Sequence, residues 1–315
     1  MAISTESNAL HGTEVLNPTI RLRAFAKVNL GLRILGKRRD GYHEIRTIYQ
    51  TIALHDRLTI SFDRRAAGLA VECDDARVPT GRGNLVFRTC ELWKRARKFQ
   101  SGIRVRLQKR IPPGSGLGGA SADAAATLLG LERLTGDQMA VDERGRLAAR
   151  LGSDVPLFLW GGRVLGCGRG EDVYPLWDLP ARKCLVVFPG FSVSTADAYK
   201  EAWRSARSRL TGAANTHNID GFGARPHFPL EHWGPAENDF EHVVFARWPE
   251  LARLKRRLIR AGAETASLTG SGSAVFAVFV SARKFSRASS FVPAGWQQFQ
   301  TRTLPRAEYE RLIFA

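Results

Sequence analysis

The sequence predicts an α+β fold, with helices and strands intermixed in both halves of the chain. Residues 20–35 alternate apolar and polar side chains, a period of two that is typical of a long strand. Residues 121–134 instead carry apolar side chains at helical spacing. In the second half, a helical pattern at 249–262 precedes an apolar strand at 274–280. The same mixture in both halves, without an internal repeat, is the basis of the α+β assignment.

The first quarter of the chain predicts a polar extension followed by three strands. Residues 1–17 lack the apolar core of a signal peptide, and we expect a flexible extension there. After the strand at 20–35, the turn residues at 38–41 predict a hairpin, because they end in Asp-Gly. Residues 45–54 would form its partner strand, and residues 57–62 a further strand.

The middle of the chain predicts helices around one exposed strand. Asn84 is placed to cap a helix over residues 85–99. Residues 103–107 alternate apolar and polar side chains and predict a half-exposed strand. A glycine-rich loop and the helix at 121–134 follow, and a second helix should end at Gly152.

The remaining segments predict a new structural unit and an insertion. Residues 161–170 are rich in glycine and predict a turn between strands. Residues 184–188 predict a buried strand that opens the new unit. Residues 207–235 are polar and weakly patterned, which indicates a helical or loop insertion.

Charge and composition limit the classes of function. The chain of 315 residues has 47 Lys and Arg against 30 Asp and Glu, a formal net charge of +17 that would attract polyanions. The basic residues are spread along the chain and form no nucleic-acid motif, so nucleic-acid binding is kept only as an alternative. No apolar run is long enough to span a bilayer.

The four cysteines predict free thiols in a reducing, cytoplasmic environment. They form no CxxC pair and have no histidine partners at metal-ligand spacing. The sequence therefore predicts neither a disulfide framework nor a zinc site.

The strongest motif is a glycine-rich loop between a strand and a helix. Such a loop turns successive backbone N–H groups and a helix N-terminus toward an anion, and phosphate is the natural ligand. No Gly-Lys-Ser or Gly-Lys-Thr triplet follows, which excludes a Walker loop. A dinucleotide loop is rejected because the preceding strand is half charged and two prolines intervene. The loop residues are Pro112, Pro113, Gly114, Ser115, Gly116, Leu117, Gly118, Gly119, Ala120 and Ser121.

Three weaker signals accompany the loop. Lys27 and Asn29 share one face of the first strand, which we expect to be solvent-exposed. Asp154 follows Gly152 and precedes Pro156, where capping a helix is the simpler interpretation. Residues 269–273 precede the last apolar strand and fit either a tight turn or a binding loop.

Taken together, these motifs resemble the GHMP small-molecule kinases, from about residue 21 to residue 280. Within that family the chain is similar to the members that phosphorylate a cytidine-diphosphate-linked methylerythritol in isoprenoid precursor synthesis. The Asp-Gly-Tyr-His segment separates these members from mevalonate, homoserine and galactose kinases. The motifs are Lys27-Val28-Asn29, Asp40-Gly41-Tyr42-His43, the loop to Ser121, Gly152 to Pro156, Asn238-Asp239, and Thr269 to Gly272.

The resemblance implies a fold, a reaction and its cofactors. The expected fold has an ATP-binding domain related to a ribosomal-protein fold at 18–178 and a substrate-binding α/β-sandwich domain at 179–315. ATP would be the phosphoryl donor, with Mg²⁺ offsetting the phosphate charge. Asp154 would take the proton of the attacking hydroxyl, and Lys27 would stabilise the transferring phosphoryl oxygens.

The resemblance also assigns binding residues. The loop from Pro112 to Ala122 would hold the ATP phosphates, with Asn84 near the nucleoside. The substrate, with its cytidine diphosphate headgroup, would contact Asn29, Tyr42, His43, Thr195, Tyr199, Gly270, Ser271 and Gly272. Among these, His43 would bind the cytosine edge, and Tyr42 and Tyr199 would sandwich the ring.

One departure from the family concerns the metal. Family members usually carry two adjacent serines where this chain has Ser121-Ala122. Ser121 is the candidate to orient Mg²⁺ or the γ-phosphate, and a plain helix residue is the alternative.

The competing functions are a GHMP kinase for mevalonate, homoserine or a sugar and, from another class, a basic nucleic-acid-binding protein. Tyr42, His43 and Tyr199 favour a substrate with a base, and both Lys27 and Asp154 are present, which argues against an inactive relative. Either a monomer or a homodimer is compatible with the sequence.

Overall fold

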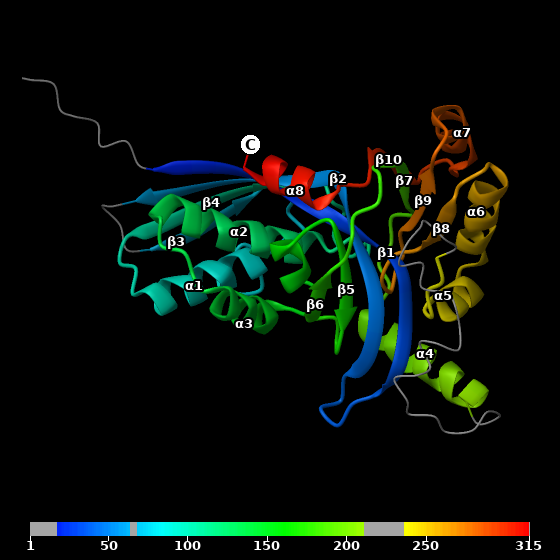
Figure 1. Ribbon diagram of the computed structural model, residues 1–315, viewed down its shortest axis with the longest axis horizontal. Helices are drawn as coiled ribbons and strands as arrows, with labels where there is room; N and C mark the ends of the chain where they lie inside the picture. The colour runs from blue at the N-terminus through cyan, green and yellow to red at the C-terminus, as the bar shows by residue number, and fades with distance from the viewer. Residues whose placement is uncertain (1–17, 64–67, 211–235, 315) are drawn as a thin grey trace, which may run out of the picture.

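The computed structural model describes residues 18–63, 68–210 and 236–314 (Figure 1). The predicted extension at 1–17 and most of the predicted insertion at 207–235 lie outside these residues. Two antiparallel-rich sheets and their covering helices make up the described chain, which confirms the α+β prediction. None of the described helices is long and apolar enough to cross a membrane.

The first sheet is six-stranded and belongs mainly to the first half of the chain. Its strands run in the order β3-β4-β2-β5-β6, and β1 pairs with β2. Only β3 and β4 pair in parallel. The strands are β1 (Thr19–Lys37), β2 (His43–Asp63), β3 (Leu69–Cys73), β4 (Gly102–Gln108), β5 (Arg163–Cys167) and β6 (Asp172–Pro175).

The second sheet is four-stranded, in the order β10-β7-β9-β8, and all its pairs are antiparallel. Its strands are β7 (Lys183–Phe188), β8 (Thr265–Leu268), β9 (Val275–Phe279) and β10 (Gln297–Arg302).

The helices lie on both sides of the long β1–β2 hairpin. Figure 1 shows α1, α2 and α3 on one side and α5, α6 and α7 on the other, with α4 beside the hairpin. The helices are α1 (Leu85–Arg97), α2 (Gly119–Thr135), α3 (Val141–Leu151), η1 (Pro156–Leu159), α4 (Thr195–Leu210), α5 (Glu241–Arg247), α6 (Pro249–Arg260), α7 (Ala282–Ala288), η3 (Ser289–Phe291) and α8 (Arg306–Ile313).

Several predicted element ends are confirmed by their caps. The Asn84 side chain accepts a hydrogen bond from Val86 N at 2.8 Å and begins α1. Helix α3 ends where predicted, because Gly152 N donates to Ala148 O. Helix α2 begins at Gly119, before the predicted start, so the last glycine of the loop is already helical.

The hairpin partner is one strand rather than two. Residues 45–54 and 57–62 were predicted as separate strands, but β2 runs unbroken through both. The predicted break was wrong because Asp56, a residue that rarely occupies a strand interior, is fully buried and accepts hydrogen bonds from Arg110 N and Ile111 N. Its charge is compensated by Lys109, so the strand can continue.

The glycine-rich segment at 161–170 was predicted as a turn, but β5 lies within it and pairs with β2. Gly166 is required inside this strand, since a Cβ there would lie 2.5 Å from Cε2 of Tyr49. The other glycines form the ends: Gly161 and Gly162 precede β5, and Gly168 and Gly170 follow it with positive φ.

Strand β1 is buried on both faces over most of its length. The expectation of an exposed polar face was therefore wrong: Lys27 is 3% exposed and Asn29 is 1% exposed. Loops from distant parts of the chain cover that face, as the site below shows.

Strand β1 also contributes to each of the four apolar clusters of the described chain. Leu22 packs with α1 and α2, and Leu32 packs with the second sheet and α6. Val28 joins a cluster beneath the second sheet, and Phe25 contacts Tyr309 of α8. Helix α8 thus returns from the end of the chain to the first half, where it contacts β1 and where Figure 1 shows it beside β2.

Candidate active site

A cavity of about 890 Å³ contains nearly all of the predicted site residues. Its wall combines β1, the hairpin turn, the glycine-rich loop, the start of α4 and the loop before β9. Two predicted residues do not line it: Ala122 is buried in the core beside α2, and Gly272 packs its backbone against Leu268. The predicted residues that line the cavity are Lys27, Asn29, Tyr42, His43, Asn84, Pro112, Pro113, Gly114, Ser115, Gly116, Leu117, Gly118, Gly119, Ala120, Ser121, Asp154, Thr195, Tyr199, Gly270 and Ser271.

Lys27 and Asp154 form an ion pair in this cavity. Lys27 Nζ lies 3.6 Å from Asp154 Oδ2 and donates a 2.8 Å hydrogen bond to Asn29 Oδ1. Burial lowers the pKa of Lys27, and the Asp154 charge opposes that shift. A poorly solvated ammonium group beside a carboxylate can stabilise the negative charge of an anionic substrate.

Asp154 does not cap a helix, so the simpler sequence interpretation was wrong. The short helix η1 begins at Pro156 and has no side-chain cap. The Asp154 carboxylate instead accepts a 3.1 Å hydrogen bond from the Tyr49 hydroxyl at Oδ1 and faces Lys27 with Oδ2. Its side chain stays 33% exposed, so it is open to a substrate. Burial and the Asp154 charge raise the pKa of Tyr49, which keeps that hydroxyl a donor.

Asn29 joins the first strand to the loop before β9. Its Oδ1 accepts from Gly270 N at 2.8 Å and from Thr269 Oγ1 at 3.2 Å, in addition to Lys27. Its Nδ2 donates to Thr47 Oγ1 at 2.8 Å. Asn29 therefore has its side chain engaged by the protein and acts as a support between two walls of the cavity.

The glycine-rich loop offers backbone donors to the cavity. Within the described chain, no backbone N–H from Gly116 to Ser121 donates a hydrogen bond to the protein. The N-terminus of α2 follows directly, and its dipole favours negative charge. The arrangement fits the phosphate groups of a nucleotide.

The loop conformation depends on close approach to the second half of the chain. A Cβ on Gly116 would lie 2.2 Å from Thr269 O, and one on Gly118 would lie 3.2 Å from Cε of Lys27. Both glycines have positive φ. Thr269 Oγ1 also donates to Gly116 O, so the two loops are in direct contact.

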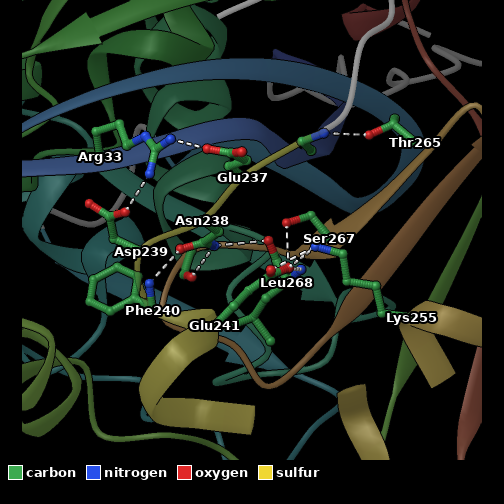
Figure 2. Close-up of polar contacts among 12 residues, drawn as sticks. Arg33, Glu237, Asn238, Asp239, Phe240, Glu241, Lys255, Thr265, Ser267 and Leu268 are labelled. Atoms are coloured by element: carbon green, nitrogen blue, oxygen red, sulfur yellow. Dashed lines mark hydrogen bonds and ion pairs between the residues drawn. The ribbon is translucent and has the colours of Figure 1, made fainter. Parts of the chain in front are cut away.

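Figure 2 shows the polar contacts of Asn238 and Glu241 with the end of β8, where the loop before β9 begins. Asn238 Nδ2 donates to Leu268 O and Gly270 O, both at 2.9 Å. Glu241 accepts from Leu268 N and Ser267 Oγ and pairs with Lys255. Asn238, part of the predicted motif, is thus a support of the loop rather than part of the cavity wall.

A buried charge cluster beneath the glycine-rich loop was missed by the sequence analysis. Lys109 Nζ bridges Asp56 and Asp123 at 2.5 and 2.7 Å, and all three side chains are nearly inaccessible to water. Burial raises the pKa of Asp123, and the charge of Lys109 opposes that shift. The cluster ties the interior of β2 and the end of β4 to α2. The one sequence signal for it is Asp123, a carboxylate within the alanine run at 122–126.

The far end of the cavity is aromatic. His43 stacks on Tyr199, with ring centroids 5.1 Å apart and planes 10° apart, and meets Trp203 edge-on. Tyr42 is 55% exposed and is covered on one side by the guanidinium of Arg169. The rings of Tyr42 and Tyr199 are thus engaged by other side chains rather than by each other. Burial and the charge of Lys37 lower the pKa of His43, so its imidazole is neutral at pH 7.

Thr195 and Ser271 close the cavity between these two ends. Their hydroxyl oxygens lie 3.0 Å apart, which joins the start of α4 to the loop before β9. No group of three metal-ligating side chains occurs in the described part of the chain, so any divalent ion would need ligands from a bound nucleotide or water.

Comparisons with known proteins agree with this geometry. The model of the GHMP kinases N terminal domain matches residues 84–162, and that of the GHMP kinases C terminal domain matches residues 230–297. A 4-diphosphocytidyl-2-C-methyl-D-erythritol kinase of Solibacter usitatus is 46% identical over 258 residues, 82% of this chain and 80% of the relative. One of Moorella thermoacetica is 38% identical over 90% of this chain and 99% of the relative.

Solved structures show the same likeness. A crystal structure of 4-(cytidine 5'-diphospho)-2C-methyl-D-erythritol kinase, 32% identical, covers 90% of this chain and 99% of its own, with a TM-score of 0.71. A homoserine kinase from Cytophaga hutchinsonii, 19% identical with a TM-score of 0.68, shares the fold.

Proposed function

Because the chain belongs to the GHMP kinases, and within them to the family of its 4-diphosphocytidyl-2-C-methyl-D-erythritol kinase relatives, we propose that it transfers the γ-phosphoryl group of ATP to the 2-hydroxyl group of that cytidine-linked alcohol. The reaction belongs to the non-mevalonate route to isoprenoid precursors. The observation that carries the proposal is the Lys27–Asp154 pair, which lies in one cavity with the unpaired N–H groups of the glycine-rich loop.

The two ends of the cavity suit the two substrates. The backbone donors from Gly116 to Ser121 hold the ATP phosphates, and Asn84 lies in the cavity wall at the nucleoside end. The aromatic end, with Tyr42, His43 and Tyr199, holds the cytidine headgroup. Thr195, Gly270 and Ser271 approach the rest of the substrate.

Asp154 and Lys27 divide the chemical work. Asp154 accepts the proton of the 2-hydroxyl as its oxygen forms a bond to the γ-phosphorus, and the bond from that phosphorus to ADP breaks. Lys27 places its positive charge beside the transferring phosphoryl oxygens and forms an ion pair with the Asp154 carboxylate. Tyr49 holds the carboxylate in place through its hydroxyl.

Mg²⁺ accompanies ATP in this proposal and offsets the charge of its phosphates. Ser121 lines the cavity in the first turn of α2 and is the residue we assign to it. The ion would otherwise be held by phosphate and water oxygens, since the described side chains form no metal cluster. All four cysteines are free, in keeping with a cytoplasmic enzyme.

The test is ADP release by the purified protein with Mg-ATP and each of four acceptors: the cytidine-linked methylerythritol, mevalonate, homoserine and galactose. We expect turnover with the cytidine-linked acceptor alone. Turnover only with another acceptor would support the proposed kinase activity and refute the proposed acceptor. Lack of turnover with all four would refute both.

A further inference from the structure

Arg169 lies in the cavity wall without a role in the reaction proposed above. It occupies the turn between β5 and β6 and lines the same cavity as Asp154 and Tyr199. The centre of its guanidinium lies 4.8 Å from the centroid of the Tyr42 ring, within the range of a cation–π contact. One face of that ring is therefore already covered by protein.

The Arg169 side chain is held in this position by its own turn. Its Nε donates to Glu171 Oε1 at 2.8 Å, and its backbone N donates to Glu171 Oε2 at 2.6 Å. Its two terminal nitrogens form no hydrogen bond to any described residue. The guanidinium thus keeps both positive charge and free donors beside the cavity.

The turns that carry Tyr42 and Arg169 are tied together through Glu44. One carboxylate oxygen accepts from Arg38 of the hairpin turn at 2.6 Å, and the other accepts from Gly168 N at 3.2 Å. Ile45 N donates to Gly168 O at 2.7 Å, which adds a backbone link. The stacking of Arg169 on Tyr42 is therefore set by the fold and is not a chance contact of two long side chains.

We propose that Arg169 determines specificity for the headgroup of the acceptor. Its side chain holds the Tyr42 ring in position for stacking on the base, and its guanidinium places a positive charge beside the diphosphate. The inference rests on the function proposed above. An exposed tyrosine fixed on one face by a cation presents its other face to a planar ligand with less loss of rotamer freedom. The free guanidinium donors match phosphate oxygens, which a sugar or a hydroxy acid without a phosphate lacks.

The test compares Arg169→Ala with Arg169→Lys and with Arg104→Ala as the control. Arg104 is an exposed arginine of β4 whose partner is Glu72, outside the cavity. For Arg169→Ala we expect the KM of the cytidine-linked acceptor to rise about fivefold to fiftyfold, while kcat and the KM of ATP stay within about twofold of wild type. For Arg169→Lys the KM of this acceptor should lie between those of wild type and Arg169→Ala, because lysine keeps the charge but loses the planar group that stacks on Tyr42. Arg104→Ala should match wild type.

Competitive inhibition by cytidine and by cytidine diphosphate separates the two parts of the role. In Arg169→Ala the inhibition constant of cytidine diphosphate should rise more than that of cytidine. Unchanged acceptor KM in Arg169→Ala, or an equal rise in the KM of ATP, would overturn the proposal. Wild-type protein that does not use the cytidine-linked acceptor would refute the proposed function instead, and this is measured before any variant.

Discussion

Replacing Lys27 by methionine should remove most turnover and leave the free energy of unfolding almost unchanged. The ammonium group is buried, and among the described residues Asp154 is its one carboxylate partner. Methionine fills a similar volume without a charge. The variant therefore separates the chemical role of the residue from its role in packing.

The energies can be compared from the geometry. At 3.6 Å and an effective dielectric constant of about 20, the attraction between Lys27 and Asp154 is about 5 kcal/mol before solvent screening. Screening reduces it, because the Asp154 side chain is a third exposed. Burying the ammonium costs several kcal/mol, so the two nearly cancel. We expect a change of less than about 2 kcal/mol in stability and a fall of about 10²- to 10³-fold in kcat.

Lys109→Met is the matched control. For both variants, thermal unfolding measures stability and ADP release measures turnover. Removing the Lys109 charge leaves two buried carboxylates, Asp56 and Asp123, without a positive partner. This variant should therefore lose about 3–5 kcal/mol of stability. Asp154, in contrast, can be solvated when Lys27 is gone. If Lys27→Met were as unstable as Lys109→Met, or kept wild-type turnover, our account of Lys27 would be refuted.

Three further variants and one change of pH test the site. Asp154→Asn should lower kcat by about 10²- to 10⁴-fold with an almost unchanged KM for ATP, and wild-type ADP release would exclude it as the base. Gly116→Ala should lower Tm and the affinity for ATP together, because a Cβ at φ +83° would lie 2.2 Å from Thr269 O; an unchanged Tm would show that the two loops move apart freely. The pKa of His43 is depressed below 6.5, so the KM of the cytidine-linked acceptor should be constant near pH 7 and rise as pH falls through that depressed pKa. His43→Ala should weaken acceptor binding and abolish this pH dependence, and a profile identical to wild type would assign it to another group.

Local patterns predicted most of the elements and the family motifs, because these depend on residues near one another in sequence. The alternation at 20–35 and the Asn84 cap are of this kind. The sequence could not show that Asn29 is buried, since its cover comes from Thr269 and Gly270, more than two hundred residues later. Nor could the sequence show the partners of Asp154, because Lys27 and Tyr49 come from β1 and β2, more than one hundred residues earlier.

Misleading local chemistry explains the remaining errors. The division between 45–54 and 57–62 was wrong, since the counter-charge that lets Asp56 lie buried within β2 is Lys109, far along the chain. The glycines at 161–170 suggested a turn, although Gly166 serves to admit the Tyr49 ring within a strand. The predicted aromatic residues line one cavity, but the stacking of His43 on Tyr199 depends on how α4 meets the hairpin. The division between residues 178 and 179 stays a prediction.

Strand β1 contributes residues to all four apolar clusters of the described chain, so the two halves should unfold together. Leu22 and Leu32 anchor the same strand in the core of each half, so neither core can open while the other keeps β1 in place. Two halves joined by a linker alone would melt in separate steps. Here we expect calorimetry to record one cooperative transition, and a chain cut after residue 178 to leave its second part unfolded.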